Sequence, residues 1–149
     1  MVETLVTSSP IKCPADKFYN FFKLNLTDIV KIFPAVYNSG EVTEGELGVV
    51  GCITTWTYTI GIGIGGTGMR MKVLTEVIED AAKTMKLSAL EGDVLVLYKS
   101  FACTLGVSEG SAKWTIEYEK DTILSPPPEI YVPVLATLIT LVDAYLLIN

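Results

Sequence analysis

The longest apolar stretch of the chain, Ile130–Ile148, contains a single charged residue, Asp143. On a helical wheel that starts at Glu129, one narrow stripe is mostly polar or small and the remaining positions form a wide apolar arc. The expected exposed stripe comprises Glu129, Pro133, Ala136, Thr137, Thr140, Asp143, Ala144 and Leu147. The expected buried arc comprises Tyr131, Val134, Leu135, Leu138, Leu141, Val142, Tyr145 and Leu146. We therefore predict one long helix, preceded by a stiff hinge and capping residue at Ser125–Pro128.

This apolar arc can be shielded from water in three ways: by lipid, by the rest of the chain, or by a bound ligand. A membrane anchor is typically flanked by basic residues at its cytoplasmic end, and the nearest one before the segment is Lys120. Asp143 inside a bilayer would cost roughly 2.5–3.5 kcal/mol. Alanine and threonine stripes also serve helix packing in membranes, so the anchor remains an alternative. The pattern favours a helix that lies on a protein surface.

The residues before this helix predict a strand, two short helices and a series of strands. A first strand at Val2–Ile11 leads to a helix beginning near Pro14, and a second short helix lies between Asp28 and Pro34. Two-residue alternation and turn signals then predict strands at Cys52–Ile60, Met71–Ile78, Thr84–Leu90, Val94–Val107 and Ala112–Glu119. Short turns favour an antiparallel meander, and the order of elements is that of an α+β fold. The length of 149 residues fits a single domain, residues 1–149.

The alternating strands give the sheet one aromatic and apolar face, which we expect to receive the long helix. Aromatic side chains with polar tips and adaptable methionines suit a cavity for an amphipathic ligand. The alternative is that the same side chains fill an ordinary core. The predicted ligand-binding residues are Phe22, Trp56, Tyr58, Met71, Val73, Met85, Leu87, Phe101, Trp114, Ile116, Tyr118, Tyr131, Leu135, Leu138 and Val142.

Charge and composition exclude several kinds of partner. The net charge is −6 without a long basic run, which makes nucleic acid a poor partner. The chain has no histidine, the commonest metal ligand and general base, and we predict neither a metal nor a cofactor. Its three cysteines are widely spaced and indicate reduced thiols. Because the first residues do not resemble a signal peptide, we expect a cytoplasmic protein, and we take the glycosylation acceptor at Asn25 as chance.

Two glycine-rich segments suggest loops. Glu44–Gly51 has three glycines, but it lacks the Gly-Lys-Ser/Thr ending of a phosphate loop, and its two glutamates would repel phosphate. Gly61–Gly68 has five glycines in eight residues. The second segment is interpreted either as a flexible hairpin tip or as a mobile gate beside the cavity.

Catalysis would require a buried acid and base. The candidate proton donors are Tyr58, Tyr118 and Tyr131. Lys99 is expected to share a strand face with Phe101 and to lie at the rim of the cavity. The remaining candidates, Lys113 and Glu117, are predicted to point outward. The sequence therefore favours binding over catalysis.

The chain resembles the plant major latex proteins, within the superfamily of the birch-pollen allergen and the pathogenesis-related proteins of class ten. The resemblance rests on the order of elements, the loop Glu44–Gly51 running into Trp56 and Tyr58, the turn Leu90–Asp93, and the strand Trp114–Lys120. It covers nearly the whole chain, from about Val2 to Asn149.

The resemblance implies a helix-grip fold, in which a curved seven-stranded antiparallel sheet, two short helices and a long C-terminal helix enclose a hydrophobic cavity. It also implies binding of a steroid, flavonoid, cytokinin, terpenoid or fatty-acid type of metabolite, and a cytoplasmic role in defence or stress. We expect a monomer or weak dimer without a stable membrane anchor. The alternative function is that of a cavity enzyme for cyclisation, condensation or isomerisation of a hydrophobic substrate. The final helix lacks the charged end usual in the family, and Gly61–Gly68 replaces a shorter hairpin turn.

Overall fold

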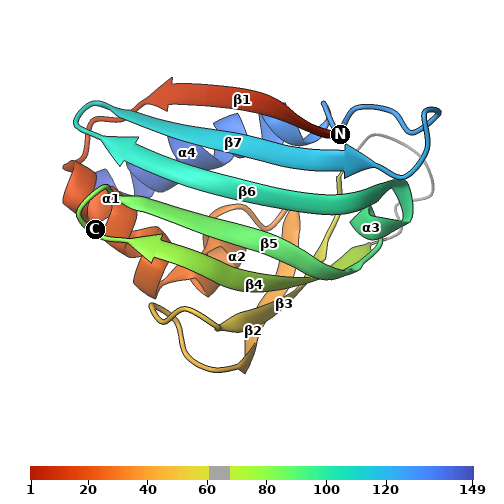
Figure 1. The fold of residues 1–149 in the computed structure, drawn as a ribbon. Helices are drawn as coiled ribbons and strands as arrows, with labels where there is room; N and C mark the ends of the chain where they lie inside the picture. The colour runs from red at the N-terminus through yellow and green to blue at the C-terminus, as the bar shows by residue number, and fades with distance from the viewer. Residues whose placement is uncertain (61–67) are drawn as a thin grey trace.

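A seven-stranded antiparallel sheet, with strand order β1-β7-β6-β5-β4-β3-β2, forms the body of the protein. The computed structural model describes residues 1–60 and 68–149. Figure 1 shows the curved sheet with the long helix α4 along one face and α1 and α2 at one end. The strands are β1 (Val2–Pro10), β2 (Tyr37–Glu44), β3 (Ile53–Tyr58), β4 (Met69–Glu79), β5 (Thr84–Gly92), β6 (Tyr98–Ser108) and β7 (Ser111–Lys120). The helices are α1 (Ala15–Leu24), the 3-10 turn η1 (Leu26–Asp28), α2 (Ile29–Ile32), α3 (Val94–Leu97) and α4 (Tyr131–Ile148).

The predicted α+β, helix-grip fold is confirmed. Alternation is clearest in β3 and β7, where every second side chain is buried in the core. In β3 the buried positions are Thr54, Trp56 and Tyr58, and the Trp56 indole Nε1 donates a hydrogen bond to Thr54 Oγ1 at 2.8 Å. In α1, which begins directly after Pro14, the rings of Phe18 and Phe22 are fully buried.

Two strand predictions differ from the structure. Val94–Leu97 forms the short helix α3 and not the start of a strand. Four consecutive apolar residues have no alternation to distinguish a strand from a buried helical turn. Asp93 helps to hold this turn in place, because its carboxylate accepts a hydrogen bond from the Arg70 backbone N–H at 2.6 Å. The second difference is β2, a mostly exposed strand to which the sequence analysis assigned no range.

A β-bulge in β6 corrects the predicted position of Lys99. The register shifts between Tyr98 and Ser100, which places an extra residue in β6 opposite β7. As a result Tyr98 and Phe101 both point into the core, with ring centroids 6.1 Å apart, while Lys99 is exposed. The expectation that Lys99 shares a face with Phe101 was therefore wrong.

The helix α4 begins at Tyr131, and no side chain caps it, so the predicted cap at Ser125 was wrong. Pro133, Thr137, Thr140, Ala144 and Leu147 are exposed as predicted. Two positions of the wheel are reversed: Asp143 is 7% exposed and Tyr145 is 37% exposed. Asp143 turns inward because two backbone N–H groups, those of Lys12 and Cys13, need an acceptor there.

The contacts of α4 show what covers its inner side. By length and composition alone α4 could cross a membrane, with a mean hydropathy of 2.0, but a core helix of a soluble protein passes the same test. Its inner side packs into the core of this protein through Leu135, Leu138, Ile139, Val142 and Leu146. Protein therefore covers this side of the helix.

The structure tests the prediction for only one of the two glycine-rich segments. Glu44–Gly51 is a loop between β2 and β3 with left-handed backbone at Gly45, Gly48 and Gly51, where φ is 70°, 87° and 97°. These conformations explain its glycines without a phosphate ligand. The hairpin-tip and gate hypotheses concern Gly61–Gly68, of which residues 61–67 lie outside the described part of the chain.

Candidate functional site

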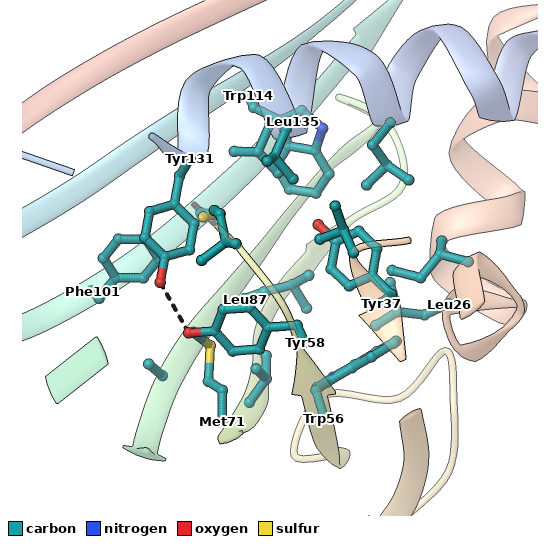
Figure 2. Close-up of a pocket in the computed structure, with 18 of the residues that line it drawn as sticks. Leu26, Tyr37, Trp56, Tyr58, Met71, Leu87, Phe101, Trp114, Tyr131 and Leu135 are labelled. Carbon is teal, nitrogen blue, oxygen red and sulfur yellow. Dashed lines mark hydrogen bonds between the residues drawn. The ribbon is translucent and has the colours of Figure 1, made fainter. Parts of the chain in front are cut away.

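A cavity of about 110 Å³ lies between the sheet and α4 and is lined by side chains from both. Figure 2 shows its wall, to which β2–β7, α4, α1, η1 and α2 contribute side chains. Nineteen described residues line it, and none of them carries a charge. Eleven belong to the predicted set, namely Phe22, Trp56, Tyr58, Met71, Val73, Leu87, Phe101, Trp114, Tyr131, Leu135 and Leu138. Their position is observed, while a role in ligand binding stays a prediction.

Four predicted residues are buried but do not line this cavity: Met85, Ile116, Tyr118 and Val142. Alternation identifies the face of a strand, but not how far along the strand a cavity extends. Tyr118, for example, packs edge to face against Tyr98, with ring centroids 5.6 Å apart. Met85, Ile116 and Tyr118 belong to the packed core, as the alternative interpretation of the sheet face expected, and Val142 of α4 belongs to the same core.

Eight further lining residues are absent from the predicted ligand-binding set, although Val134 was expected on the buried arc of the long helix: Leu26, Ile29, Val36, Tyr37, Ile60, Ala89, Cys103 and Val134. Ala89 and Cys103 follow the same alternation as Leu87 and Phe101, so the periodicity contained a signal for them. Tyr37 belongs to β2, to which no range had been assigned. Leu26 lies in η1 and Ile29 in α2. These helical segments are too short for their periodicity to show which side faces a cavity.

A pair of tyrosine hydroxyls forms the main polar feature of the cavity. Tyr58 Oη and Tyr131 Oη are 2.9 Å apart, within hydrogen-bond distance (Figure 2). The Tyr131 ring packs against Phe101, with centroids 5.0 Å apart, which fixes its position at the start of α4. Burial raises the pKa of Tyr58 to about 12, although its hydrogen bond with Tyr131 acts in the opposite direction. Burial also raises the pKa of Tyr131, so both hydroxyls keep their protons at neutral pH.

Two more polar groups, the hydroxyl of Tyr37 and the thiol of Cys103, belong to the lining. Burial raises the pKa of the Cys103 thiol to about 12, and burial and the proximity of Cys103 raise the pKa of Tyr37. Cys103 is a free cysteine, as are Cys13 and Cys52. Within residues 1–60 and 68–149, no three acidic, cysteine or histidine side chains come together to hold a metal ion.

A curved seven-stranded sheet around one long helix, with an apolar cavity between them, defines a class of small-molecule-binding folds. Residues 1–149 match the pathogenesis-related protein Bet v 1 family, and the chain belongs to that family. Members of this family commonly bind hydrophobic ligands.

Individual relatives agree with this membership. The chain is 33% identical to major latex protein 146 of Papaver somniferum over 86% of this chain and 80% of that protein. The crystal structure of major latex-like protein 151 from Panax ginseng aligns with a TM-score of 0.90 and 26% identity, covering 97% of each chain. The predicted resemblance to the major latex proteins is thus confirmed. Norcoclaurine synthase from Thalictrum flavum aligns with a TM-score of 0.77 over 100% of this chain and 88% of its own, but at 18% identity it shows the fold alone.

Proposed function

We propose that this protein binds a hydrophobic or amphipathic small molecule between the sheet and α4, and that it carries or sequesters this molecule. The observation that carries the proposal is the uncharged cavity, whose described lining is almost entirely aromatic and aliphatic. Such a lining with a few polar groups is typical of small-molecule sites. From the family we further propose a plant metabolite as ligand, a role in defence or stress, a cytoplasmic location and a monomer or weak dimer.

The volume of the cavity limits the ligand that fits without movement. Pockets for drug-sized ligands have volumes of roughly 300–1,000 Å³, whereas this cavity has about 110 Å³. An engineered apolar cavity of about 150 Å³ in another protein accommodates benzene. We therefore expect small aromatic molecules to enter with little rearrangement, and a molecule of steroid size to require movement of lining side chains or of α4.

Catalysis is the alternative function, and the cavity supports it less well. The described lining residues include no carboxylate, amine or imidazole, so tyrosine hydroxyls and one thiol are the titratable groups available. Their raised pKa values keep them protonated at neutral pH, which makes them poor general bases. Incubation with plant extract, followed by mass spectrometry, tests the alternative by looking for a product that depends on the protein.

Titration with N-phenyl-1-naphthylamine, a neutral apolar fluorescent probe, tests the binding proposal directly. The probe is larger than benzene, so its binding also requires the movement of lining side chains or of α4 expected above. We expect saturable binding to the wild type and at least about tenfold weaker binding to Ala89→Leu, because the larger side chain occupies the cavity. Ala102→Leu is the matched control, since strand alternation places Ala102 on the opposite face of the sheet from Phe101 and Cys103. Absence of saturable probe binding to the wild type, or equal weakening by both substitutions, would overturn the proposal.

A further inference from the structure

The cavity presents a free hydrogen-bond donor in an otherwise apolar wall. Tyr58, from β3, and Tyr131, from α4, share one hydrogen bond between their hydroxyls. Each hydroxyl carries one hydrogen, so when one hydroxyl donates to the other, the accepting hydroxyl still has its own hydrogen to donate. No described residue accepts that second hydrogen. The pair therefore offers one donor to whatever occupies the cavity.

A second wall of the cavity contributes a donor of the same kind. The Tyr37 hydroxyl, from β2, has no hydrogen-bond partner among the described residues, and Figure 2 shows its oxygen directed toward the cavity interior. The indole Nε1 of Trp114, from β7, also has no partner among residues 1–60 and 68–149, but this atom is fully buried and is not exposed to the cavity. Buried donors in proteins are normally paired, with protein, water or ligand. The Tyr58–Tyr131 pair and Tyr37 around one cavity therefore indicate a ligand that supplies acceptors.

The same lining disfavours a charged ligand. No lysine, arginine, aspartate or glutamate is among its described residues, so a carboxylate or ammonium group inside would lack a counter-charge. Burial of an unpaired charge is strongly unfavourable. A phenolic hydroxyl that remains protonated can donate to a neutral oxygen, and the raised pKa values of Tyr58 and Tyr131 preserve that state at neutral pH.

We infer that the cavity selects a neutral amphipathic molecule whose carbonyl oxygen accepts the free hydrogen of the Tyr58–Tyr131 pair, in preference to an ionised molecule of the same shape. This inference rests on the proposed function and adds the chemical class of its ligand. Among the ligand types that the family suggests, neutral ketones and related oxygenated molecules fit this site. An ionised fatty acid does not.

Three compounds of nearly equal shape test the inference by displacement of N-phenyl-1-naphthylamine at pH 7.5. They are 4-phenylbutan-2-one, a ketone; butylbenzene, a hydrocarbon; and 3-phenylpropanoate, an anion. We expect 3-phenylpropanoate to bind at least about tenfold more weakly than the ketone, because its charge is unpaired in the cavity. In the double variant Tyr58→Phe/Tyr131→Phe, we expect the affinity for the ketone relative to butylbenzene to fall about three- to tenfold.

The double variant is preferred to either single one, since each hydroxyl left alone would still donate. When both hydroxyls are removed, no unpaired buried hydroxyl is left behind. The protein is therefore expected to remain folded. Tyr98→Phe is the control, because the Tyr98 hydroxyl donates to the Pro126 carbonyl oxygen and does not line the cavity. An unchanged ketone-to-hydrocarbon ratio in the double variant, or equal binding of ketone and anion, would refute the inference but leave the proposed function intact. Failure of the probe to bind at all would instead refute the proposed function.

Discussion

The carboxylate of Asp143, in the second turn from the end of α4, accepts a hydrogen bond from the backbone N–H of Cys13 at 2.9 Å, 130 residues away in sequence. Both carboxylate oxygens also lie 3.0 Å from the backbone N–H of Lys12. The adjoining helix α1 adds a contact through Lys17, whose ammonium group donates to the Leu146 carbonyl oxygen at 2.6 Å. The segment between β1 and α1 is thereby attached to the helix that closes the cavity.

Replacing Asp143 with alanine should destabilise the protein by about 1–3 kcal/mol, because the buried N–H of Cys13 would lose its acceptor and an unpaired buried donor costs about that much, whereas the N–H of Lys12 is only partly buried. The free energy of unfolding in urea measures this effect. Thr140→Ala, one turn earlier on the exposed side of α4, is the control and should change it by less than about 0.5 kcal/mol. Equal effects of the two substitutions would contradict the role assigned to Asp143.

The stabilisation by Asp143 should depend on pH. Burial acts to raise the pKa of its carboxyl, but the hydrogen bonds from Cys13 and Lys12 outweigh burial, and the pKa is lower than the usual 3.8. A carboxyl whose pKa is lowered by folding stabilises the folded state above its unfolded pKa, and this contribution disappears as the pH falls through the folded pKa.

The difference in unfolding free energy between the wild type and Asp143→Asn should accordingly be constant from about pH 5 to pH 8 and shrink below about pH 3.8. Comparison with the variant is needed because the pKa values of Glu76, Asp80 and Glu119 are also lowered. A difference that grows on acidification would show that the Asp143 carboxylate does not contribute in this way.

The case of Asp143 shows why the fold was more predictable from sequence than the contacts of α4. Helical periodicity sorts residues by polarity, and it placed Thr137, Thr140 and Asp143 on one stripe. It contains no information about unpaired N–H groups elsewhere in the chain, which here draw one member of that stripe into the core. A buried polar residue with a distant backbone partner is invisible to local pattern.

The site was predictable to a similar degree for a related reason. Alternation identified Trp56, Tyr58 and Trp114 as inward-facing, and all three line the cavity. It failed at Lys99, because the bulge in β6 adds a residue and reverses the alternation there. It also could not identify Tyr37, which reaches the cavity from a strand with mostly exposed residues.

The bulge leads to a prediction about Lys99. Since this side chain is exposed and does not line the cavity, Lys99→Ala should leave the dissociation constant for N-phenyl-1-naphthylamine unchanged within about twofold and the unfolding free energy within about 0.5 kcal/mol. Fluorescence titration and urea unfolding provide the two values. A marked loss of probe binding would instead support the position at the rim of the site that the sequence predicted for Lys99.

Gly40 and Trp56 face each other across β2 and β3, and the indole occupies the space that a Cβ at position 40 would take. Gly40→Ala should therefore displace the Trp56 ring, cost about 1–3 kcal/mol of stability and weaken binding of N-phenyl-1-naphthylamine. The ring cannot move freely, because Trp56 Nε1 is bonded to Thr54. Urea unfolding followed by tryptophan fluorescence measures the loss of stability, and fluorescence titration with N-phenyl-1-naphthylamine measures the weaker binding.

Gly106→Ala, in β6, is the matched control for Gly40→Ala, because a Cβ at Gly106 would meet nothing within 4 Å. It should leave probe affinity unchanged. If both alanine variants were as stable as the wild type, the close approach of Trp56 to Gly40 would not be a constraint on this sheet.

Cys103 should report on occupancy of the cavity. Its pKa, raised by burial from 9.0 to about 12, lowers the thiolate fraction near pH 8 by about a thousandfold, so alkylation by N-ethylmaleimide should be correspondingly slow. Slowness alone is not specific, because burial also raises the pKa of Cys13 to about 12. Cys103 differs from Cys13 in lining the cavity, so saturating N-phenyl-1-naphthylamine should slow the alkylation of Cys103 further and leave the rate at Cys13 unchanged. Peptide mass spectrometry measures the two rates separately, with the urea-unfolded chain as the fully reactive reference. Equal protection of both thiols would mean that the probe stabilises the whole fold and does not occupy the space beside Cys103.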